Sequence, residues 1–176
     1  MGEWELLYWI QEHCRSPIGD SLMVFISAIG NGGGIWIVLA AWLIWKRETR
    51  SAGLAVLAGL LLAALAANLT LKPLVGRLRP SDIDTAVSLL VARPTDASFP
   101  SGHTAASFAA AAVLYKSGSS WWKPAMALAV VMGFSRLYLF VHFPSDVLGG
   151  AGIGLAAGYT AVWLLRRLTH KKENQQ

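Results

Sequence analysis

Cysteine is almost absent from this sequence, in which Cys14 is the only one. A disulfide within the chain is therefore excluded, and so is a metal site built from several thiolates. Charge is scarce as well, because Asp, Glu, Lys and Arg make up 14% of the residues whereas hydrophobic residues make up 55%. A soluble domain of 176 residues cannot bury that much apolar surface. These scarcities indicate a protein that is embedded in a membrane.

Long stretches of the chain contain neither a charged residue nor a histidine. They are residues 21–45, 51–71, 104–115, 124–135 and 147–165. Several approach the ~20 residues that a helix needs to cross a bilayer. Residues 51–71 are long enough for a full span, which Lys72 and Pro73 should end. The sequence thus predicts an all-α fold, a polytopic integral membrane helical bundle that forms a single domain over residues 1–176.

Two segments do not fit a simple spanning helix. Residues 2–14 mix Trp and Tyr with Glu and Gln, which is typical of a helix that lies in the membrane interface. Glu3 and Glu5 stand where a signal peptide would be basic, so we expect the chain to keep this segment. Further along, the run Gly30–Gly34 (Gly-Asn-Gly-Gly-Gly) should break any helix. Residues 17–46 therefore form either one span or two short helices.

The distribution of cations suggests an orientation in the membrane. The net charge of +5 does not indicate a nucleic-acid partner, because Lys and Arg lie in short loops rather than on one basic face. One predicted side of the membrane holds Lys46, Arg47, Arg50, Lys116, Lys123, Arg166, Arg167, Lys171 and Lys172. By the positive-inside rule that side is cytoplasmic. The other side holds Lys72, Arg77, Arg79, Arg93 and Arg136. This second group is an excess that the rule disfavours, so it requires another reason.

Three polar segments reach this second side and carry residues suited to phosphate chemistry. They are KPLVGRLRP at residues 72–80, PSGH at residues 100–103 and SRLYLFVHFPSD at residues 135–146. Lys72, Arg79 and Arg136 provide three cations, and the two guanidinium groups suit bidentate capture of phosphate oxygens. Alternatively, such side chains at helix ends simply extend toward the lipid headgroups.

The second and third segments add groups that could act on a bound phosphate. Ser101 can cap the helix that PSGH begins, while free amides such as that of Gly102 favour an anion there. His142 and Asp146 stand four residues apart across a proline, so the carboxylate can turn back toward the imidazole. His103 is a second histidine, from a different segment. Each feature also has a structural explanation, as a capped helix start or as a helix-breaking proline followed by an N-terminal Asp.

The motifs KxxxxxxRP, PSGH and SRxxxxxHxxxD occur here complete and in this order. With them, the chain resembles the type 2 phosphatidic acid phosphatase (PAP2) superfamily. The resemblance covers residues 72–146 in motifs and essentially the whole chain in hydropathy. It implies about six transmembrane helices with both termini cytoplasmic, in addition to the interfacial helix, and it favours two helices in residues 17–46. The superfamily also includes soluble vanadium haloperoxidases, but the hydropathy favours the membrane branch.

The resemblance also implies a role for each motif residue. His142 would be the nucleophile that attacks phosphorus, Asp146 would fix its tautomer, and His103 would protonate the leaving oxygen. The groups that would hold the phosphate oxygens are Lys72, Arg79, Ser101, Gly102 and Arg136. The family's chemistry is metal-independent, so no metal or other cofactor is expected. The sequence likewise offers no carboxylate cluster or His/Cys set for a metal.

The expected substrate is a phosphate on a lipid whose tail stays in the bilayer. The short loop of residues 81–99 predicts a shallow site, open to the membrane, on the periplasmic or extracellular face of the plasma or inner membrane. The form SLLVARPTDASFPSGH resembles undecaprenyl pyrophosphate phosphatases, which would make undecaprenyl phosphate from undecaprenyl pyrophosphate. Phosphatidylglycerophosphate or phosphatidate is an alternative substrate, and a small transporter or channel is a distant alternative function.

Overall fold

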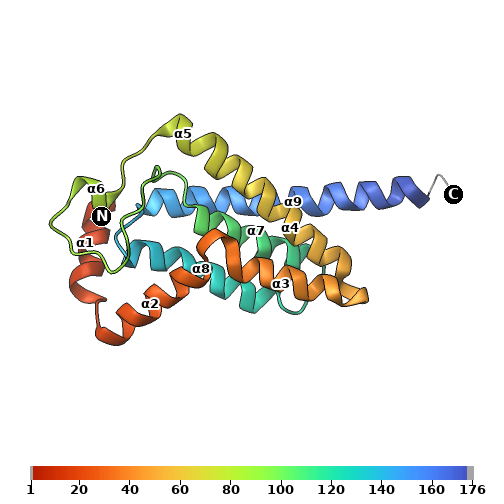
Figure 1. Cartoon of the computed structure of the whole chain (residues 1–176), viewed down its shortest axis with the longest axis horizontal. Coiled ribbons are helices and arrows are strands. Elements are labelled where there is room, and N and C mark those ends of the chain that lie inside the picture. Colours follow the sequence, from red (N-terminus) through yellow and green to blue (C-terminus); the bar gives the residue numbers. More distant parts are fainter. Residues whose placement is uncertain (1, 174–176) are drawn as a thin grey trace.

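The computed structural model describes residues 2–173, with side chains as far as residue 168. Regular structure in these residues is helical, as predicted (Figure 1). In chain order the elements, with η for short 3-10 or π segments, are α1 (Glu3–His13), α2 (Pro17–Ile29), η1 (Asn31–Gly33), α3 (Gly34–Trp45), η2 (Arg47–Thr49), α4 (Arg50–Ala64), η3 (Leu65–Leu71), α5 (Lys72–Val75), α6 (Pro80–Ile83), α7 (Gly102–Lys116), α8 (Trp122–Tyr138) and α9 (Pro144–Glu173).

Helix α7 is the centre of the bundle and packs against α4, α8 and α9. Small residues make this possible, because Ala109 and Ala110 are fully buried and let neighbouring backbones approach closely. The contact with α9 is especially tight. A Cβ atom added at Gly158 would lie 2.6 Å from the carbonyl oxygen of Ala109, well inside van der Waals contact. The α7–α9 pair therefore forms a rigid framework for the segments at its ends.

The glycine-rich run breaks the first apolar stretch into two helices, as one of the two expectations had it. Helices α2 and α3 meet at η1 with a bend of 50°. Gly32 and Gly33 have φ angles of 59° and 75°, in the left-handed region that residues with a side chain rarely adopt. These two glycines allow the chain to turn sharply within three residues.

The helix that begins with α4 does not end at Lys72 and Pro73, so that predicted boundary is wrong. The chain continues helically through η3 and α5, and ends at Gly76, whose φ is 58°. The reason is the π-helical geometry of η3, in which the amide of Lys72 bonds to the carbonyl of Ala67, five residues earlier. This wider turn opens the hydrogen-bond ladder next to Pro73, which lacks an N–H. Lys72 therefore lies within the helix.

By length and composition alone, the described residues contain fewer candidate membrane spans than the six expected. Two helical segments, Arg47–Ile83 and Pro144–Leu168, are long and apolar enough to cross a membrane, and α2 with α3 adds a third if the bent pair is one span. Helices α7 and α8 have 15 and 17 residues, which is shorter than the ~20 residues that a spanning helix needs. The chain is thus an all-α membrane protein with transmembrane helices, while six spans are not confirmed.

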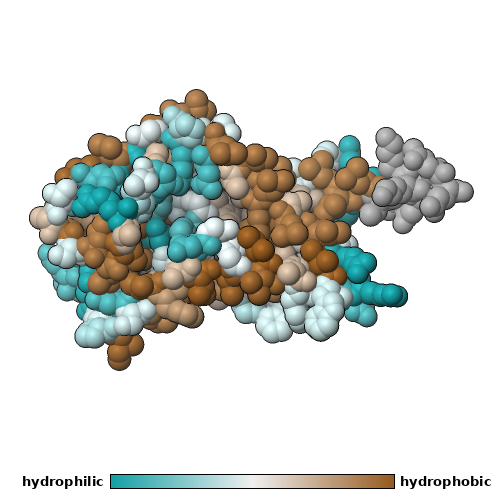
Figure 2. Space-filling view, viewed as in Figure 1, coloured by the Kyte–Doolittle hydropathy of each residue, from teal (hydrophilic) through white to brown (hydrophobic). Residues whose placement is uncertain are grey.

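The predicted grouping of cations matches the two ends of the bundle. Arg166 near the end of α9 donates to the carbonyl of Lys116 at 2.8 Å, and the rings of Trp42 and Trp121 lie 6.4 Å apart, so these loops share one end. Helices α1, α5 and α6 lie at the opposite end (Figure 1). Figure 2 shows hydrophobic surface between the two ends and hydrophilic surface gathered at each. The side chains of Lys171 and Lys172 lie outside the described residues.

Candidate active site

A cavity of about 570 Å³ lies between α2, α4, α7 and the loop that follows α6. It is lined by six of the residues predicted for the site, namely Lys72, Arg79, Gly102, His103, Arg136 and His142. The lining also includes apolar residues, namely Val24 and Ala28 from α2 and Leu60, Ala63 and Ala64 from α4. Ser101 and Asp146 are fully buried behind the lining residues. The cavity therefore has a cationic part and an apolar part.

His142 lies between α8 and α9 with only 2% of its surface exposed. Its Nε2 is 3.0 Å from Nη1 of Arg79. A guanidinium group can only donate, so Nε2 accepts with its lone pair and the ring proton is on Nδ1. The pKa of His142 is lowered to about 3, chiefly by burial and further by the positive charge of Arg79. The hydrogen bond and charge of Asp146 raise this pKa but do not outweigh the burial. The ring is therefore neutral, and Nε2 is the unprotonated nitrogen.

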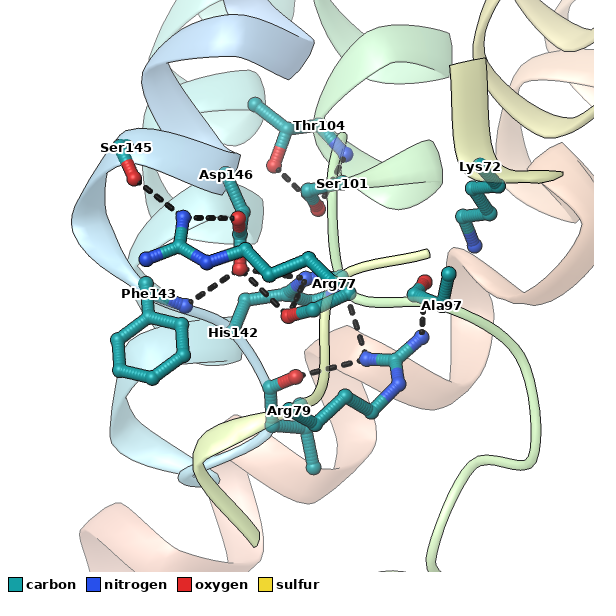
Figure 3. Close-up of polar contacts among 12 residues, drawn as sticks. Lys72, Arg77, Arg79, Ala97, Ser101, Thr104, His142, Phe143, Ser145 and Asp146 are labelled. Carbon is teal, nitrogen blue, oxygen red and sulfur yellow. Dashed lines mark hydrogen bonds and ion pairs between the residues drawn. The ribbon is translucent and has the colours of Figure 1, made fainter. Parts of the chain in front are cut away.

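Asp146 is held in place by three donors (Figure 3). One of them, Ser98, also lies beside the imidazole of His142. Oδ1 accepts from Nη1 of Arg77 at 2.7 Å, while Oδ2 accepts from Ser98 Oγ at 2.5 Å and from the Phe143 amide at 2.8 Å. Nδ1 of His142 lies 3.6 Å from Oδ2 and 3.5 Å from Ser98 Oγ. The predicted approach of Asp146 to His142 is present, but the sequence did not indicate Ser98.

Arg77 connects this pair to the N-terminal helix. Its Nη2 lies 2.7 Å from one carboxylate oxygen of Glu3, and the other oxygen accepts from the Ser145 amide at 2.9 Å. Glu3 belongs to α1, which was predicted only as an interfacial helix. Its contacts place α1 against the start of α9, directly behind Asp146. Arg77 was predicted to lie on this side of the protein, without a role.

Arg79 is enclosed by acceptors and is 2% exposed. Besides His142, its Nη1 contacts the carbonyl of Val141 at 2.7 Å, and its Nη2 contacts the carboxylate of Asp96 at 2.8 Å. The other oxygen of Asp96 accepts from Lys72. Burial raises the pKa of Asp96, but the hydrogen bond and charge of Lys72, with those of Arg79, outweigh it and lower that pKa to about 2. Asp96 is therefore ionised, and the sequence did not indicate it.

Arg136 is the third cation, and it is only partly paired. It is 5% exposed, and its Nη1 donates to Ser27 Oγ from α2. Its Nε is buried and has no hydrogen-bond partner among the described residues. A buried guanidinium N–H without an acceptor is costly. Because Arg136 lines the cavity, its guanidinium group is suited to an anion that enters it.

His103 and Gly102 begin helix α7 at the wall of the cavity. Nε2 of His103 lies 2.9 Å from Oδ1 of Asn31, so the glycine-rich turn also positions this histidine. A Cβ at Gly102 would lie 2.8 Å from Oδ1 of Asn68, so a larger residue at this position would require the Asn68 side chain to move. Ser101 acts as the predicted cap, because its Oγ accepts from the amide and the hydroxyl of Thr104.

The site is deeper than the short loop predicted. His142 and Arg79 are almost fully buried because the loop of residues 84–101 folds over them. Leu90 and Val91 of this loop pack against a buried cluster that includes Ile10 of α1 and Val141, and the amide of Ser98 bonds to the carbonyl of Arg77 at 2.8 Å. A short loop covers the site here because α1 supports it from outside. Within the described part of the chain, no three His, Cys, Asp or Glu side chains are grouped to hold a metal.

A membrane helical bundle that places a neutral histidine beside three cations has the groups required for phosphoryl transfer. The chain belongs to the PAP2 superfamily, whose family model matches residues 52–170. This confirms the resemblance on which the predictions rest. The motif residues all lie within the matched region, whereas the cavity is completed by residues of α2 and η1, which precede that region.

Similarity to individual proteins extends over most of the chain. The chain is 31% identical to an undecaprenyl-diphosphatase of Sulfolobus acidocaldarius over 81% of this chain and 69% of that protein. It is 33% identical to the undecaprenyl-diphosphatase BcrC of Bacillus subtilis over 82% of this chain and 74% of that protein. The crystal structure of Aquifex aeolicus LpxE superposes with a TM-score of 0.78 at 29% identity, covering 90% of this chain and 93% of that one.

Proposed function

We propose that this PAP2-type lipid phosphatase removes the terminal phosphate of undecaprenyl pyrophosphate through a phosphohistidine intermediate on His142, without a metal ion. The observation that carries the proposal is the neutral imidazole of His142, whose unprotonated Nε2 contacts Arg79 in a cavity that also holds Lys72 and Arg136. A nucleophile and a set of cations in one enclosed cavity can act on the same phosphoryl group.

In the first step, Nε2 of His142 forms a bond to the terminal phosphorus as the bond from phosphorus to the leaving oxygen breaks. Burial and the charge of Arg136 lower the pKa of free His103 to about 3, so His103 takes up a proton when the anionic phosphate enters the cavity. It then gives this proton to the leaving oxygen. The ring of His142 becomes positively charged, and Asp146 stabilises this charge because it is aligned by Arg77 and Ser98. For a diphosphate substrate the leaving group is the lipid monophosphate.

In the second step, water attacks the phosphohistidine and His103 takes the proton from that water. The bond from phosphorus to Nε2 breaks, and inorganic phosphate leaves. Throughout, Lys72, Arg79 and Arg136 hold the oxygens around phosphorus, which is the main contribution a protein makes to phosphoryl transfer. The amide of Gly102 at the start of α7, capped by Ser101, adds a donor and the favourable end of a helix dipole.

The shape of the cavity supports a lipid substrate. Part of its lining is apolar and belongs to α2 and α4, so a hydrocarbon chain can pass from the bilayer toward the cations. Two similar proteins carry the name undecaprenyl-diphosphatase, which favours a polyprenyl diphosphate. The nine Lys and Arg residues that the sequence assigns to the opposite side of the membrane favour a cytoplasmic location for that side. They therefore favour an active site on the periplasmic or extracellular side.

The test is phosphate release by the purified protein from undecaprenyl pyrophosphate, phosphatidylglycerophosphate and phosphatidate, presented at equal mole fraction in neutral detergent. We expect the highest kcat/KM with undecaprenyl pyrophosphate, unchanged after EDTA treatment and gel filtration, and none with His142→Ala. Faster hydrolysis of a monophosphate lipid contradicts the substrate, and loss with EDTA that Mg²⁺ restores contradicts the metal-free mechanism. Release in detergent also separates an enzyme from a transporter or channel.

A further inference from the structure

The cationic part of the cavity already contains an anion, and that anion belongs to the protein. One carboxylate oxygen of Asp96 lies 2.8 Å from Nη2 of Arg79, and the other accepts from Nζ of Lys72. The backbone carbonyl of Asp96 accepts from Nε of Arg79 at 2.9 Å. Figure 3 shows Lys72 and Arg79 reaching the segment around Ala97 from opposite sides. Two of the three cations are thus bridged by one carboxylate.

The partners of this bridge differ in burial. The side chain of Asp96 is 54% exposed, whereas those of Lys72 and Arg79 are 10% and 2% exposed. The two cations are therefore fixed in the wall, while the carboxylate is half-exposed on a loop and can turn into solvent. The third cation, Arg136, does not contact Asp96 and keeps an unpartnered buried Nε. A fourth cation of the lining, Arg93, lies 3.6 Å from a carboxylate oxygen of Asp82. Of Lys72, Arg79 and Arg136, an incoming phosphate therefore meets one open cation and two that are occupied by Asp96.

We propose that Asp96 is a specificity-determining residue, which competes for Lys72 and Arg79 and so admits terminal phosphates while excluding the phosphodiester headgroups of ordinary phospholipids. This inference rests on the proposed function of the same site. A phosphodiester has one negative charge and two free oxygens, as a carboxylate has. A terminal phosphate has up to two charges and three free oxygens, and it can engage Arg136 as well.

The competition favours the carboxylate over a diester because Asp96 is tethered. A group on a short flexible linker has an effective concentration on the order of millimolar or higher. A diester headgroup offers no additional contact with which to overcome this advantage. A terminal phosphate does, because it brings more charge and a third free oxygen that can engage the guanidinium group of Arg136, which lines the cavity. When inorganic phosphate leaves, the carboxylate can return to the two cations and so assist its release.

The experiment compares wild type with Asp96→Asn and Asp96→Ala, with Asp84→Asn as the matched control. Asp84 is a carboxylate of the same loop that contacts Tyr8 and the Ala86 amide rather than the cationic wall. Inhibition by orthovanadate is measured in detergent micelles, and then inhibition by added phosphatidylglycerol, with diacylglycerol as the neutral control lipid. Vanadate binding is also followed by the rise in thermal unfolding temperature, which does not require activity.

Both Asp96 variants should bind orthovanadate about tenfold more tightly, the scale expected for a hydrogen bond between charged groups. Phosphatidylglycerol should inhibit these variants and leave wild type and Asp84→Asn unaffected. Unchanged or weaker vanadate binding by both variants, with wild type binding normally, overturns this inference alone and assigns Asp96 to alignment of the cations. Failure of wild type to bind vanadate or to release phosphate from any lipid overturns the proposed function itself.

Discussion

The imidazole of His142 has two nitrogens with different surroundings, and this difference determines what the residue can do. Nδ1 faces Ser98 and Asp146, while Nε2 faces Arg79. The proton belongs on the side of the carboxylate, which leaves a lone pair on the side of the cations. We expect the assignment of nucleophile and acid to follow from this arrangement, because His103 contacts an amide rather than a carboxylate.

Arg77 should act as a positioning residue for Asp146. Replacing it with Met removes a 2.7 Å contact to Oδ1, so kcat should fall by about 10- to 100-fold, the scale seen when a supporting hydrogen bond is lost at a reactive site. Vanadate affinity should change little, because Arg77 does not line the cavity. The measurement is kcat beside the vanadate Ki, with Arg77→Lys expected to recover part of kcat. A variant that loses vanadate binding while kcat persists would show that Arg77 binds phosphate directly.

The pKa of Asp96 predicts a stability change with a defined pH range. Its folded-state value of about 2 lies below the ordinary 3.8, so its ion pairs stabilise the fold above pH ~4 and are lost as pH falls through about 2. Asp96→Asn should therefore lower the unfolding temperature at pH 7, by an amount that shrinks between pH 4 and pH 2. Thermal unfolding in detergent, with Asp84→Asn for comparison, measures this. A difference that stays constant down to the lowest pH would contradict the assigned ion pairs.

Which residues could be predicted depended on whether their contacts are local. His142, Asp146 and the cations of the motifs were predictable because their types and spacing are unusual in apolar surroundings. Ser98, Asp96 and Asn31 were not, because their importance comes from the path of a loop and a turn through space. Arg77 gave a usable signal, since a cation between Lys72 and Arg79 on the disfavoured side needed an explanation.

The helices α7 and α9 approach so closely that glycine is required at the contact. A Cβ at Gly154 would overlap the carbonyl oxygen of Ala105, whereas a Cβ at Gly152 meets nothing within 4 Å. Gly154→Ala should destabilise the protein by about 1–3 kcal/mol through overpacking. Gly152→Ala should instead stabilise it by up to about 1 kcal/mol through helix propensity. Denaturant or thermal unfolding in detergent distinguishes them, and equal effects at both positions would contradict the packing described.

The ends of helices were predictable where one residue type dominates the sequence locally. The prediction failed where backbone hydrogen bonding determines whether the helix continues. The run Gly30–Gly34 predicted a break because several adjacent glycines cannot sustain a helix. The continuation past Pro73 could not be foreseen, because it depends on the π-helical turn of η3. The number of spans also stays a prediction, since α7 and α8 are short and their position in a bilayer depends on neighbours.

The two ends of the molecule differ. One end carries the loops with Lys46 and Lys116, the opposite end carries the candidate active site, and apolar surface separates them (Figure 2). If the positive-inside rule holds, a cysteine at Ser88 in a Cys14→Ala background should react with an impermeant thiol reagent on intact cells. A cysteine at Ser120, in the exposed loop between α7 and α8, should react only after lysis. Both positions are exposed, so access to the reagent depends on the side of the membrane. The reverse labelling pattern would contradict the proposed orientation.

The most direct test of the account is whether phosphate becomes covalently bound to His142. In rapid-quench experiments with a labelled aryl phosphate, whose leaving group needs little protonation, His103→Ala should form the intermediate and then stall. The trapped phosphoprotein should be stable in base and labile in acid, as a phosphohistidine is, and it should be absent from His142→Ala. A labelled intermediate that persists in His142→Ala would contradict the proposed mechanism.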